Sequence, residues 1–477
     1  MEPEPANRFL IRLCEKKNIS EKDISKFLET SLSRGGEFAE IFLEYRTGHS
    51  VKMEDDILKE TSEVISQGLG IRVINKDQTG YGYTNDLSAS AVKEAALTAA
   101  AVASGKQKLP AAREFSEPEI PHLYSSPDFS SGFEKKIQIV RQTYQAATHA
   151  DSRIKKARVM LLDQIQYSGI WNSHGLRAFD RKPLLKMICT TIAEQNRVRE
   201  AGYSGGGGRM GLEYFSDNPP SRIGEEAARE ALSLLEAEPA PAGEMPVILA
   251  PGDSGVLIHE AVGHLLEADF IRKKTSVFHD KRGTRVGTEQ VNIFDDPTIP
   301  YFRGSYNLDD EGTVPRKTIL IEGGIIKGML QDRLSARLMD MDLTGHGRRE
   351  NYSCIPIPRM SNTYIAEGEY APEEIIRSVN RGIYARRFQG GQVEDSGRFT
   401  FSLSSGQLIE NGVLTVPVKQ ATLIGSNLDI LSKVEQVGSD LKFGLQTGTC
   451  GKEGQSVPVT DGCPTIKISR MTVGGHT

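Results

Sequence analysis

Apolar residues recur with a helical period in several stretches of the first half of the chain. One stretch opens at Ser20 and has Asp23 three residues later, the pattern of a capping box, and it stops at Gly35 and Gly36. The pattern predicts two helices between about residues 8 and 34, and further helices over residues 87–104, 133–149 and 221–237.

Strand-like runs fill the intervals between these helices. Residues from about 153 to 203 are dominated by strand patterns, and the polar segment Asn75–Gly80 has the composition of a turn. Four consecutive glycines follow at Gly205–Gly208, and no Gly-Lys-Ser/Thr sequence comes after them, so they are not a phosphate loop. We interpret them as a flexible linker, with a close approach of two backbones as the alternative. The other strands predicted in this half are residues 38–45, 64–69, 71–74 and 81–83.

A stretch rich in Pro, Ala and Gly, residues 238–243, divides the chain. We place the domain boundary there, with an N-terminal domain of helices and antiparallel strands over residues 1–240 that could enclose a substrate. The C-terminal domain, residues 241–477, is predicted to be rich in strands. Its predicted elements are strands over 245–250, 398–403, 406–409, 413–418 and 465–473, a hairpin around 322–324, and helices over 333–341 and 424–436.

The order of these elements indicates the fold class. Strands and helices do not alternate regularly, and no repeat of 20 to 50 residues is evident. We therefore expect an α+β protein of two domains.

Composition narrows the functional classes. The 477 residues are 38% hydrophobic and 25% charged, as in an ordinary globular protein. A net charge of −5 without a basic block argues against nucleic acid as a direct partner, and the apolar runs are too short to cross a membrane. The polar, acidic start of the chain is not a secretory signal. The five cysteines are odd in number and form no C-x-x-C pair, which favours reduced thiols in the cytoplasm.

The most informative motif is His259-Glu260-Ala-Val-Gly-His264, which lies in an apolar, helix-compatible run after the turn Pro251-Gly252. It is one residue longer than H-E-x-x-H, in which two histidines bind zinc and the glutamate is the general base. On a regular helix, side chains five residues apart point about 140° away from each other. A π-bulge would absorb the extra residue, and Gly263 would ease the deviation. Asp253 or Ser254 could cap the helix.

The residue types leave the third metal ligand open. Glu267 follows His264 by three residues and shares its helical face, so it is the main rival to a cysteine, with a supporting carboxylate as its other interpretation. Cys450 lies in the small-residue segment Gly448-Thr-Cys-Gly451, which we expect to be a turn that lets a thiolate approach a metal. The complete set of candidates is Glu267, His279, His346, Cys354, Cys450 and Cys463.

Two charged groups stand outside this motif. Asp309-Asp310-Glu311 could hold a second cation, but an exposed acidic turn is the favoured interpretation. Arg348 and Arg349 could bind a substrate carboxylate or form structural salt bridges. Neither the acidic segment nor the two arginines are assigned to the site, and the substrate-binding residues stay unassigned.

Several segments together resemble the TldD/PmbA family of metallopeptidases, which is also described as modulators of DNA gyrase. The resemblance extends over essentially the whole chain, and because both H-E-x-x-x-H and a late cysteine are present, it is to TldD-like rather than PmbA-like subunits. The segments that carry it are His259–His264, Leu343–Tyr352, Cys450–Pro458, Gly35–Glu40 and Thr472–Gly475.

The resemblance implies one zinc ion per chain, held by His259, His264 and Cys450, with Glu260 beside it as general base. It implies a peptidase that acts on peptides or unfolded protein segments, as a homodimer or as a heterodimer with a PmbA-like subunit. Two alternatives remain: a peptide-binding or regulatory subunit of such a complex, and a metallohydrolase that acts on other amides.

Overall fold

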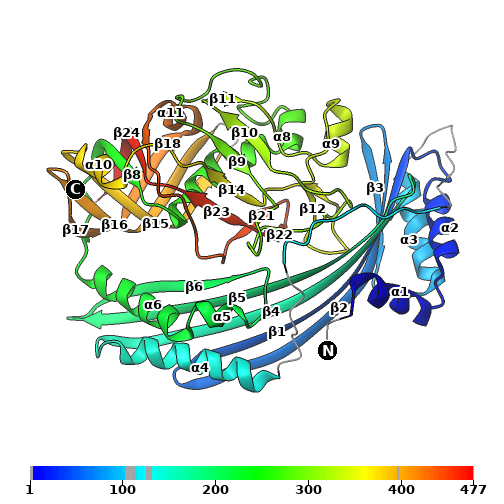
Figure 1. Ribbon diagram of the computed structural model, residues 1–477, viewed down its shortest axis with the longest axis horizontal. Helices are drawn as coiled ribbons and strands as arrows, with labels where there is room; N and C mark the ends of the chain where they lie inside the picture. Colours follow the sequence, from blue (N-terminus) through cyan, green and yellow to red (C-terminus); the bar gives the residue numbers. More distant parts are fainter. Residues whose placement is uncertain (1–3, 103–110, 112–113, 125–131, 395–396, 476–477) are drawn as a thin grey trace.

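An antiparallel six-stranded sheet forms the N-terminal half of the molecule (Figure 1). The computed structural model describes residues 4–102, 111, 114–124, 132–394 and 397–475. The strands are β1 (Phe38–Glu54), β2 (Ile57–Asn75), β3 (Gln78–Thr84), β4 (Ile154–Asn172), β5 (Arg177–Gln195) and β6 (Val198–Gly208). Their spatial order is β3-β2-β1-β4-β5-β6, so two three-stranded meanders meet where β1 pairs with β4.

Tight turns set the register of these long strands. Asp55 and Asp56 connect β1 to β2 with positive φ angles of 53° and 57°, and Asn196 and Arg197 do the same between β5 and β6 with 52° and 67°. Two left-handed residues are the signature of the turn whose twist matches paired strands. The sequence pattern detected only parts of β1 and β2, because the half of β2 next to the first turn is mostly exposed and shows no alternation of buried and exposed positions.

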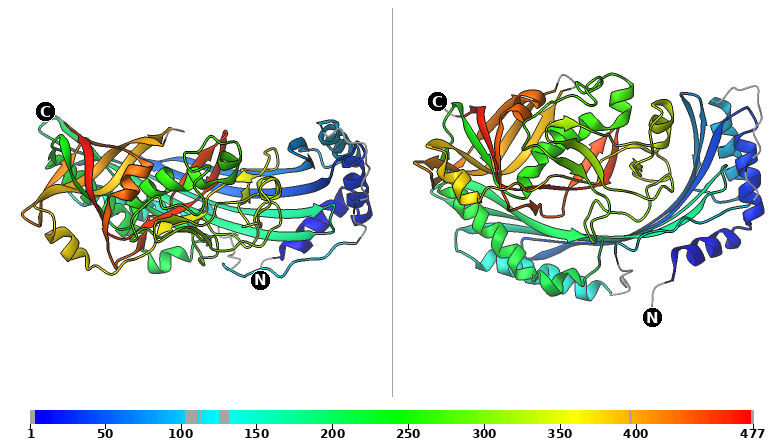
Figure 2. Two further views of the ribbon diagram at one scale, coloured as in Figure 1. Left: turned by 90° about the horizontal axis from the view of Figure 1, so that it is seen from above. Right: turned by 45° about the horizontal axis from the view of Figure 1, so that its top comes forward.

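Helices cover one face of this sheet, and the C-terminal half lies against the other (Figures 1 and 2). The helices are α1 (Ala6–Lys16), α2 (Glu21–Ser31), α3 (Ala89–Val102), α4 (Phe133–His149), α5 (Tyr214–Asp217) and α6 (Pro220–Leu235). Two buried clusters result, one beneath α1, α2 and α3 and one beneath α4 and α6. The capping box predicted at Ser20 and Asp23 is present at the start of α2.

The C-terminal half contains two further sheets and two small hairpins. Its strands are β7 (Glu238–Pro239), β8 (Gly243–Leu249), β9 (Ile293–Asp295), β10 (Thr318–Glu322), β11 (Ile325–Ile326), β12 (Gly347–Arg348), β13 (Ile357–Pro358), β14 (Asn362–Ile365), β15 (Arg381–Val393), β16 (Arg398–Glu410), β17 (Val413–Lys419), β18 (Ala421–Ser426), β19 (Val434–Val437), β20 (Lys442–Phe443), β21 (Thr449–Lys452), β22 (Gln455–Pro458), β23 (Thr460–Cys463) and β24 (Ile466–Gly474). Its α-helices are α7 (Val256–Ile258), α8 (Ala268–Arg272), α9 (Arg333–Leu338), α10 (Pro372–Arg377) and α11 (Asn427–Ser432).

Strand pairing in the larger of these sheets closes on itself. β15 pairs with β8 and β16, β16 with β18, β18 with β24, and β24 with β8. The other sheet has the order β11-β10-β9-β14-β23-β20. A single large apolar cluster fills the space between them, which places β8 and the segment after it in the centre of the C-terminal half.

The α+β class is confirmed, and several element predictions need correction. The predicted helix over 424–436 is present but too long: β18 extends to Ser426, α11 covers only six residues, and β19 follows. The linker interpretation of Gly205–Gly208 is wrong, because these residues end β6 and are buried. The alternative is confirmed, since a Cβ at Gly208 would lie 2.5 Å from the backbone carbonyl oxygen of Tyr301. The domain boundary near residue 240 stays a prediction.

The acidic segment Asp309-Asp310-Glu311, expected to be exposed, is buried between the two halves. It contributes to ion pairs that join the N-terminal sheet to the C-terminal loops. The pairs are Glu311–Arg72 at 2.5 Å, Asp310–Lys182 at 2.7 Å, Glu40–Arg72 at 2.8 Å and Glu40–Arg349 at 2.6 Å. Arg349 is therefore a structural residue, one of the two interpretations its sequence position allowed.

Candidate metal centre

The motif segment is a helix broken into four pieces. After β8 the chain forms a 3-10 turn (Asp253–Gly255), α7, a π-helix (His259–Gly263) and a second 3-10 turn (His264–Leu266). The π-bulge predicted from the five-residue histidine spacing is thereby confirmed. Gly263 is also needed for packing, because a Cβ there would lie 1.9 Å from the Met360 sulfur.

The predicted side-chain cap at the start of this segment is wrong. Asp253 accepts from the Leu445 amide at 2.9 Å and pairs with Arg387, while the Ser254 hydroxyl donates to the Ala250 carbonyl. The two Asp253 contacts, with Arg387 of β15 and with Leu445 just after β20, are long-range, and no local pattern contains them.

The π-helix turns both histidines toward Cys450. Among the described residues, one ligand atom from each of His259, His264 and Cys450 lies within 4.8 Å of the others. The two imidazole rings are 5.2 Å apart at 87°, and the Cys450 sulfur is 3.3 Å from His264 Nε2. Cys450 lies in strand β21, opposite Val457 of β22, so the expected turn is a hairpin strand instead.

A carboxylate stands behind each imidazole. Asp461 Oδ1 lies 2.6 Å from His259 Nδ1, and Glu267 Oε2 lies 3.0 Å from His264 Nδ1. A carboxylate on one ring nitrogen orients the other nitrogen toward a metal and increases its basicity. Glu267 thus lies where its alternative interpretation, a supporting carboxylate, would place it. The role of Asp461 was missed, since nothing in its local sequence marks it.

The electrostatics favour a thiolate at this position. Burial by itself raises the pKa of the Cys450 thiol, but His259 and His264 bring that pKa well below its usual value. Burial lowers the pKa of His264, whereas Glu267 and Cys450 raise it, with a net result of about 10. Burial raises the pKa of Glu267, but Lys452 and His264 together lower it to about 2. A cation placed between the thiolate and the imidazoles would take the place of these protons.

Glu260 lies on the open side of the centre. Its Oε2 is 3.9 Å from His264 Nε2, and its side chain keeps 32% of its surface exposed, against 3% for His259. Solvent can therefore reach the carboxylate from outside while His259 stays enclosed.

The remaining candidate ligands do not join this group within the described part of the chain. The His346 imidazole is buried 2.8 Å from Asp295, and the Cys463 thiol lies 3.1 Å from the Ser254 hydroxyl. The candidates excluded by their positions are His279, His346, Cys354 and Cys463.

Two imidazoles and one thiolate form a set that suits zinc, and three protein ligands leave a fourth position for water or substrate. The residues present therefore fit a catalytic rather than a closed structural site.

Family models cover most of the chain. They are described as PmbA/TldA metallopeptidase domain 1 (residues 39–103), central domain (127–235) and C-terminal domain (242–475). The chain belongs to the TldD/PmbA family of metallopeptidases. The family resemblance of the sequence is thus confirmed, and the protein is a metalloprotease.

Whole-length relatives carry metalloprotease names, some of which include TldD. A metalloprotease TldD homologue of Haemophilus influenzae is 39% identical over 96% of this chain and 97% of its own length. The metalloprotease MJ0996 of Methanocaldococcus jannaschii is 37% identical over 92% and 96%. A protein of Saccharolobus solfataricus, 26% identical over 94% and 99%, is named a zinc metalloprotease TldD homologue.

Solved structures share the fold. A Thermotoga maritima protein described as a candidate modulator of a DNA gyrase superposes with a TM-score of 0.78 at 22% identity, covering 95% of this chain and all of the other. TldE from Thermococcus kodakarensis superposes with a TM-score of 0.75 at 19% identity, with the same coverage.

No helix in the described ranges combines the length and apolar character that crossing a bilayer requires.

Proposed function

We propose that this family member is a zinc-dependent peptidase that hydrolyses peptides or unfolded protein segments. His259, His264 and Cys450 hold one zinc ion per chain, and Glu260 is the general base. The observation that carries the proposal is the meeting of three ligand atoms within 4.8 Å, two of them on imidazoles backed by carboxylates. The zinc name of the Saccharolobus relative also supports it.

Residues around the zinc site would have separate roles in hydrolysis. A bound zinc ion supplies Lewis acidity, which polarises the scissile carbonyl and acidifies a water. Glu260 holds a carboxylate oxygen near that water, takes its proton and passes it to the leaving amine. Asp461 and Glu267 keep the two imidazoles oriented, and the buried surroundings of His259 exclude competing water.

Glu260→Gln tests the assignment of the base. We expect the variant to keep its zinc and to lose at least about 100-fold in turnover, since a positioned base contributes about 10²–10⁴-fold. The measurement pairs zinc content with cleavage of a labelled unfolded protein, and small amide substrates are assayed in parallel. Exposed Glu453→Gln, on the turn of the β21–β22 hairpin, is the matched control.

The outcomes separate the alternatives. Unchanged cleavage by Glu260→Gln would remove Glu260 from the mechanism. Zinc binding without cleavage of any substrate by the wild type would favour a binding or regulatory subunit. Cleavage of small amides but not of the unfolded protein would favour the other metallohydrolase class.

We further propose that the chain works as a homodimer or as a heterodimer with a PmbA-like subunit, in the cytoplasm. Ile57, Leu58, Val64 and Ile65 are exposed on β2, and an exposed apolar group of this kind is typical of an assembly surface. The five free thiols suit a reducing compartment. Light scattering of the chain alone and with a PmbA-like chain would distinguish the two assemblies.

A further inference from the structure

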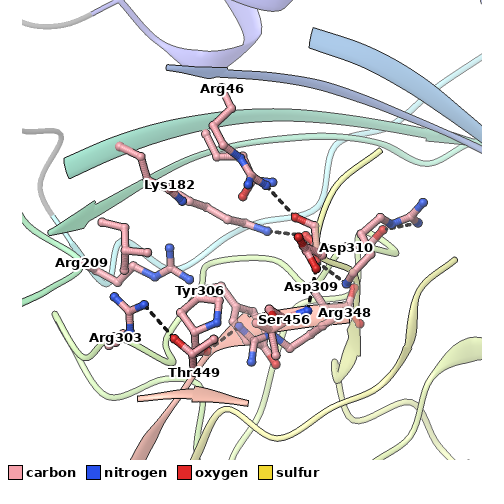
Figure 3. Close-up of a pocket in the computed structure, with 17 residues that line it drawn as sticks. Arg46, Lys182, Arg209, Arg303, Tyr306, Asp309, Asp310, Arg348, Thr449 and Ser456 are labelled. Atoms are coloured by element: carbon pink, nitrogen blue, oxygen red, sulfur yellow. Dashed lines mark hydrogen bonds and ion pairs between the residues drawn. The ribbon is translucent and has the colours of Figure 1, made fainter. Parts of the chain in front are cut away.

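A cavity of about 180 Å³ lies between the N-terminal sheet and the C-terminal loops (Figure 3). Six cationic side chains and three acidic ones line it. The cationic residues are Arg46, Lys182, Arg209, Arg303, Arg348 and Arg349, and the acidic ones are Asp309, Asp310 and Glu350.

Three of the cations have carboxylate partners. These pairs are Arg46–Glu44 at 2.7 Å, Lys182–Asp310 at 2.7 Å and Arg349–Glu40 at 2.6 Å. The other two acidic groups already accept hydrogen bonds: Asp309 from the amides of Glu311, Thr313 and Gly347, and Glu350 from the Ser456 amide. Six cationic side chains against three acidic ones leave the cavity lining with an excess of positive charge.

The remaining cations are Arg209, Arg303 and Arg348, which are only 3%, 5% and 4% exposed. Within the described ranges none of them is ion-paired with a carboxylate. Their hydrogen bonds go to neutral oxygens: Ser305 and Pro183 carbonyls for Arg209, the Gly448 carbonyl and Thr449 hydroxyl for Arg303, and Met360 and Pro458 carbonyls for Arg348.

Arg303 Nη1 is buried without a hydrogen-bond partner among the described residues. Burial, and to a smaller extent the nearby charge of Arg209, lower the pKa of Arg303 to about 9. The surroundings therefore disfavour the charged form of this guanidinium. A buried charge without a counter-charge is strongly destabilising, whereas a guanidinium is well shaped to bind a carboxylate or phosphate through two hydrogen bonds.

The glycine run explains how the charges come together. A Cβ at Gly208 would lie 2.5 Å from the Tyr301 carbonyl, and the Arg209 amide donates to that same carbonyl at 2.8 Å. The end of β6 thus docks on the loop that carries Arg303. Arg348 reaches the cavity over the Tyr306 ring, with 5.0 Å between guanidinium and ring centre.

We propose that this cavity binds a small oxyanion, either the carboxylate of a peptide or a phosphate group, between Arg209, Arg303 and Arg348. The site is separate from the three candidate zinc ligands, none of which lines it. It borders them through Thr449, which directly precedes Cys450 in β21. Occupation of the cavity would therefore stabilise the hairpin that carries the thiolate.

Calorimetric titration of the zinc-loaded chain tests the proposal with three probes. They are inorganic phosphate, an N-acetylated dipeptide with a free C-terminal carboxylate, and the same dipeptide amidated. Saturable binding of the acid but not the amide indicates a peptide carboxylate, and binding of phosphate alone indicates a phosphate source. If neither anion binds saturably, the proposal is overturned.

Arg303→Gln is expected to weaken anion binding at least about ten-fold, because a charge-assisted contact is lost. Exposed Arg316→Gln is the matched control and should bind as wild type does. Equal affinity in Arg303→Gln and wild type would overturn the proposal. If Arg303→Gln does not melt cooperatively, Arg348→Lys decides instead: this variant of a cavity-lining arginine keeps the charge but loses the guanidinium that can bind an oxyanion through two hydrogen bonds, and unchanged affinity in it would overturn the proposal.

Discussion

At the scale of single residues, the candidate metal centre depends on groups that stand behind its ligands. Asp461 and Glu267 each approach a histidine Nδ1, so the two Nε2 atoms are available on the side where Cys450 lies. The two histidines form a recognisable motif in the sequence. Asp461 comes from strand β23, far along the chain, and has no motif of its own.

Asp461→Asn is expected to lower zinc affinity about 10- to 100-fold, the usual effect of removing a carboxylate behind a histidine ligand. Competition with a chromophoric chelator measures it, and zinc content gives a readout independent of activity. Asp440→Asn, which removes a carboxylate that accepts from Thr465 instead, serves as the control. Wild-type affinity in Asp461→Asn would show that the His259 ring is held by packing alone.

Asp332 gives a residue-scale prediction about pH. Burial and the neighbouring Glu311 raise the pKa of Asp332 to about 6. Because the folded-state pKa lies above the unfolded value of about 3.9, the contribution to stability is complete below that value and is lost as pH rises through about 6. Asparagine can still accept from the Ser335 amide at the start of α9, without ionising.

We therefore expect Asp332→Asn to be more stable than wild type by about 3 kcal/mol at pH 8 and to match it near pH 4, at about 1.36 kcal/mol per pKa unit. Urea unfolding at several pH values checks this. A stability difference that does not change between pH 4 and pH 8 would contradict the assignment.

At the scale of elements, the π-helix and the β21–β22 hairpin form the centre together. The π-helix places histidines five residues apart on one side, and strand alternation turns Cys450 and Thr449 to opposite faces. A regular α-helix or a one-residue slip of the hairpin would separate the three ligands.

Gly263→Ala tests the packing of the π-helix. The new Cβ would lie 1.9 Å from the Met360 sulfur, so we expect a loss of about 1–3 kcal/mol in stability, as for other overpacked sites, and weaker zinc binding. Gly451→Ala, on the hairpin next to Cys450, has open space around its Cβ and is the matched control. Equal urea midpoints for the two variants would mean that Met360 moves aside freely.

At the scale of the whole molecule, ion pairs buried between the halves join them into one unit. Glu40 of β1 pairs with Arg72 of β2 and with Arg349 of the C-terminal half, and all three side chains are almost completely buried. Removing one partner from such a group leaves uncompensated charge.

Glu40→Gln is expected to cost about 3–5 kcal/mol of unfolding free energy. Fluorescence of Trp171, the only tryptophan, reports on the N-terminal sheet, and zinc release reports on the C-terminal half. Both transitions should shift together. Glu54→Gln, which removes a surface partner of Arg158, is the control, and a shift seen only by Trp171 would show that the halves unfold separately.

The sequence by itself determined the α+β class, the helices with strong apolar periodicity, the π-bulge and the two candidate histidine ligands, whereas Cys450 was indicated only by the family resemblance. Apart from Cys450, these depend on local spacing: the helical period, a capping box, and histidines five residues apart. The sequence missed about half of β1 and β2, because the exposed part of β2 has no alternation of buried and exposed positions, and it misjudged Gly205–Gly208 as a linker and Asp309–Glu311 as exposed.

Only the tertiary structure decided which groups meet. It brought Cys450 to the histidines and Asp461 behind His259, because β21 and β23 pack against the π-helix from about 190 residues farther along the chain. It also gathered Arg209, Arg303 and Arg348 around one cavity. Burial and long-range neighbours set the charge and contacts of these groups, and neither is encoded in the residues adjacent to them in sequence.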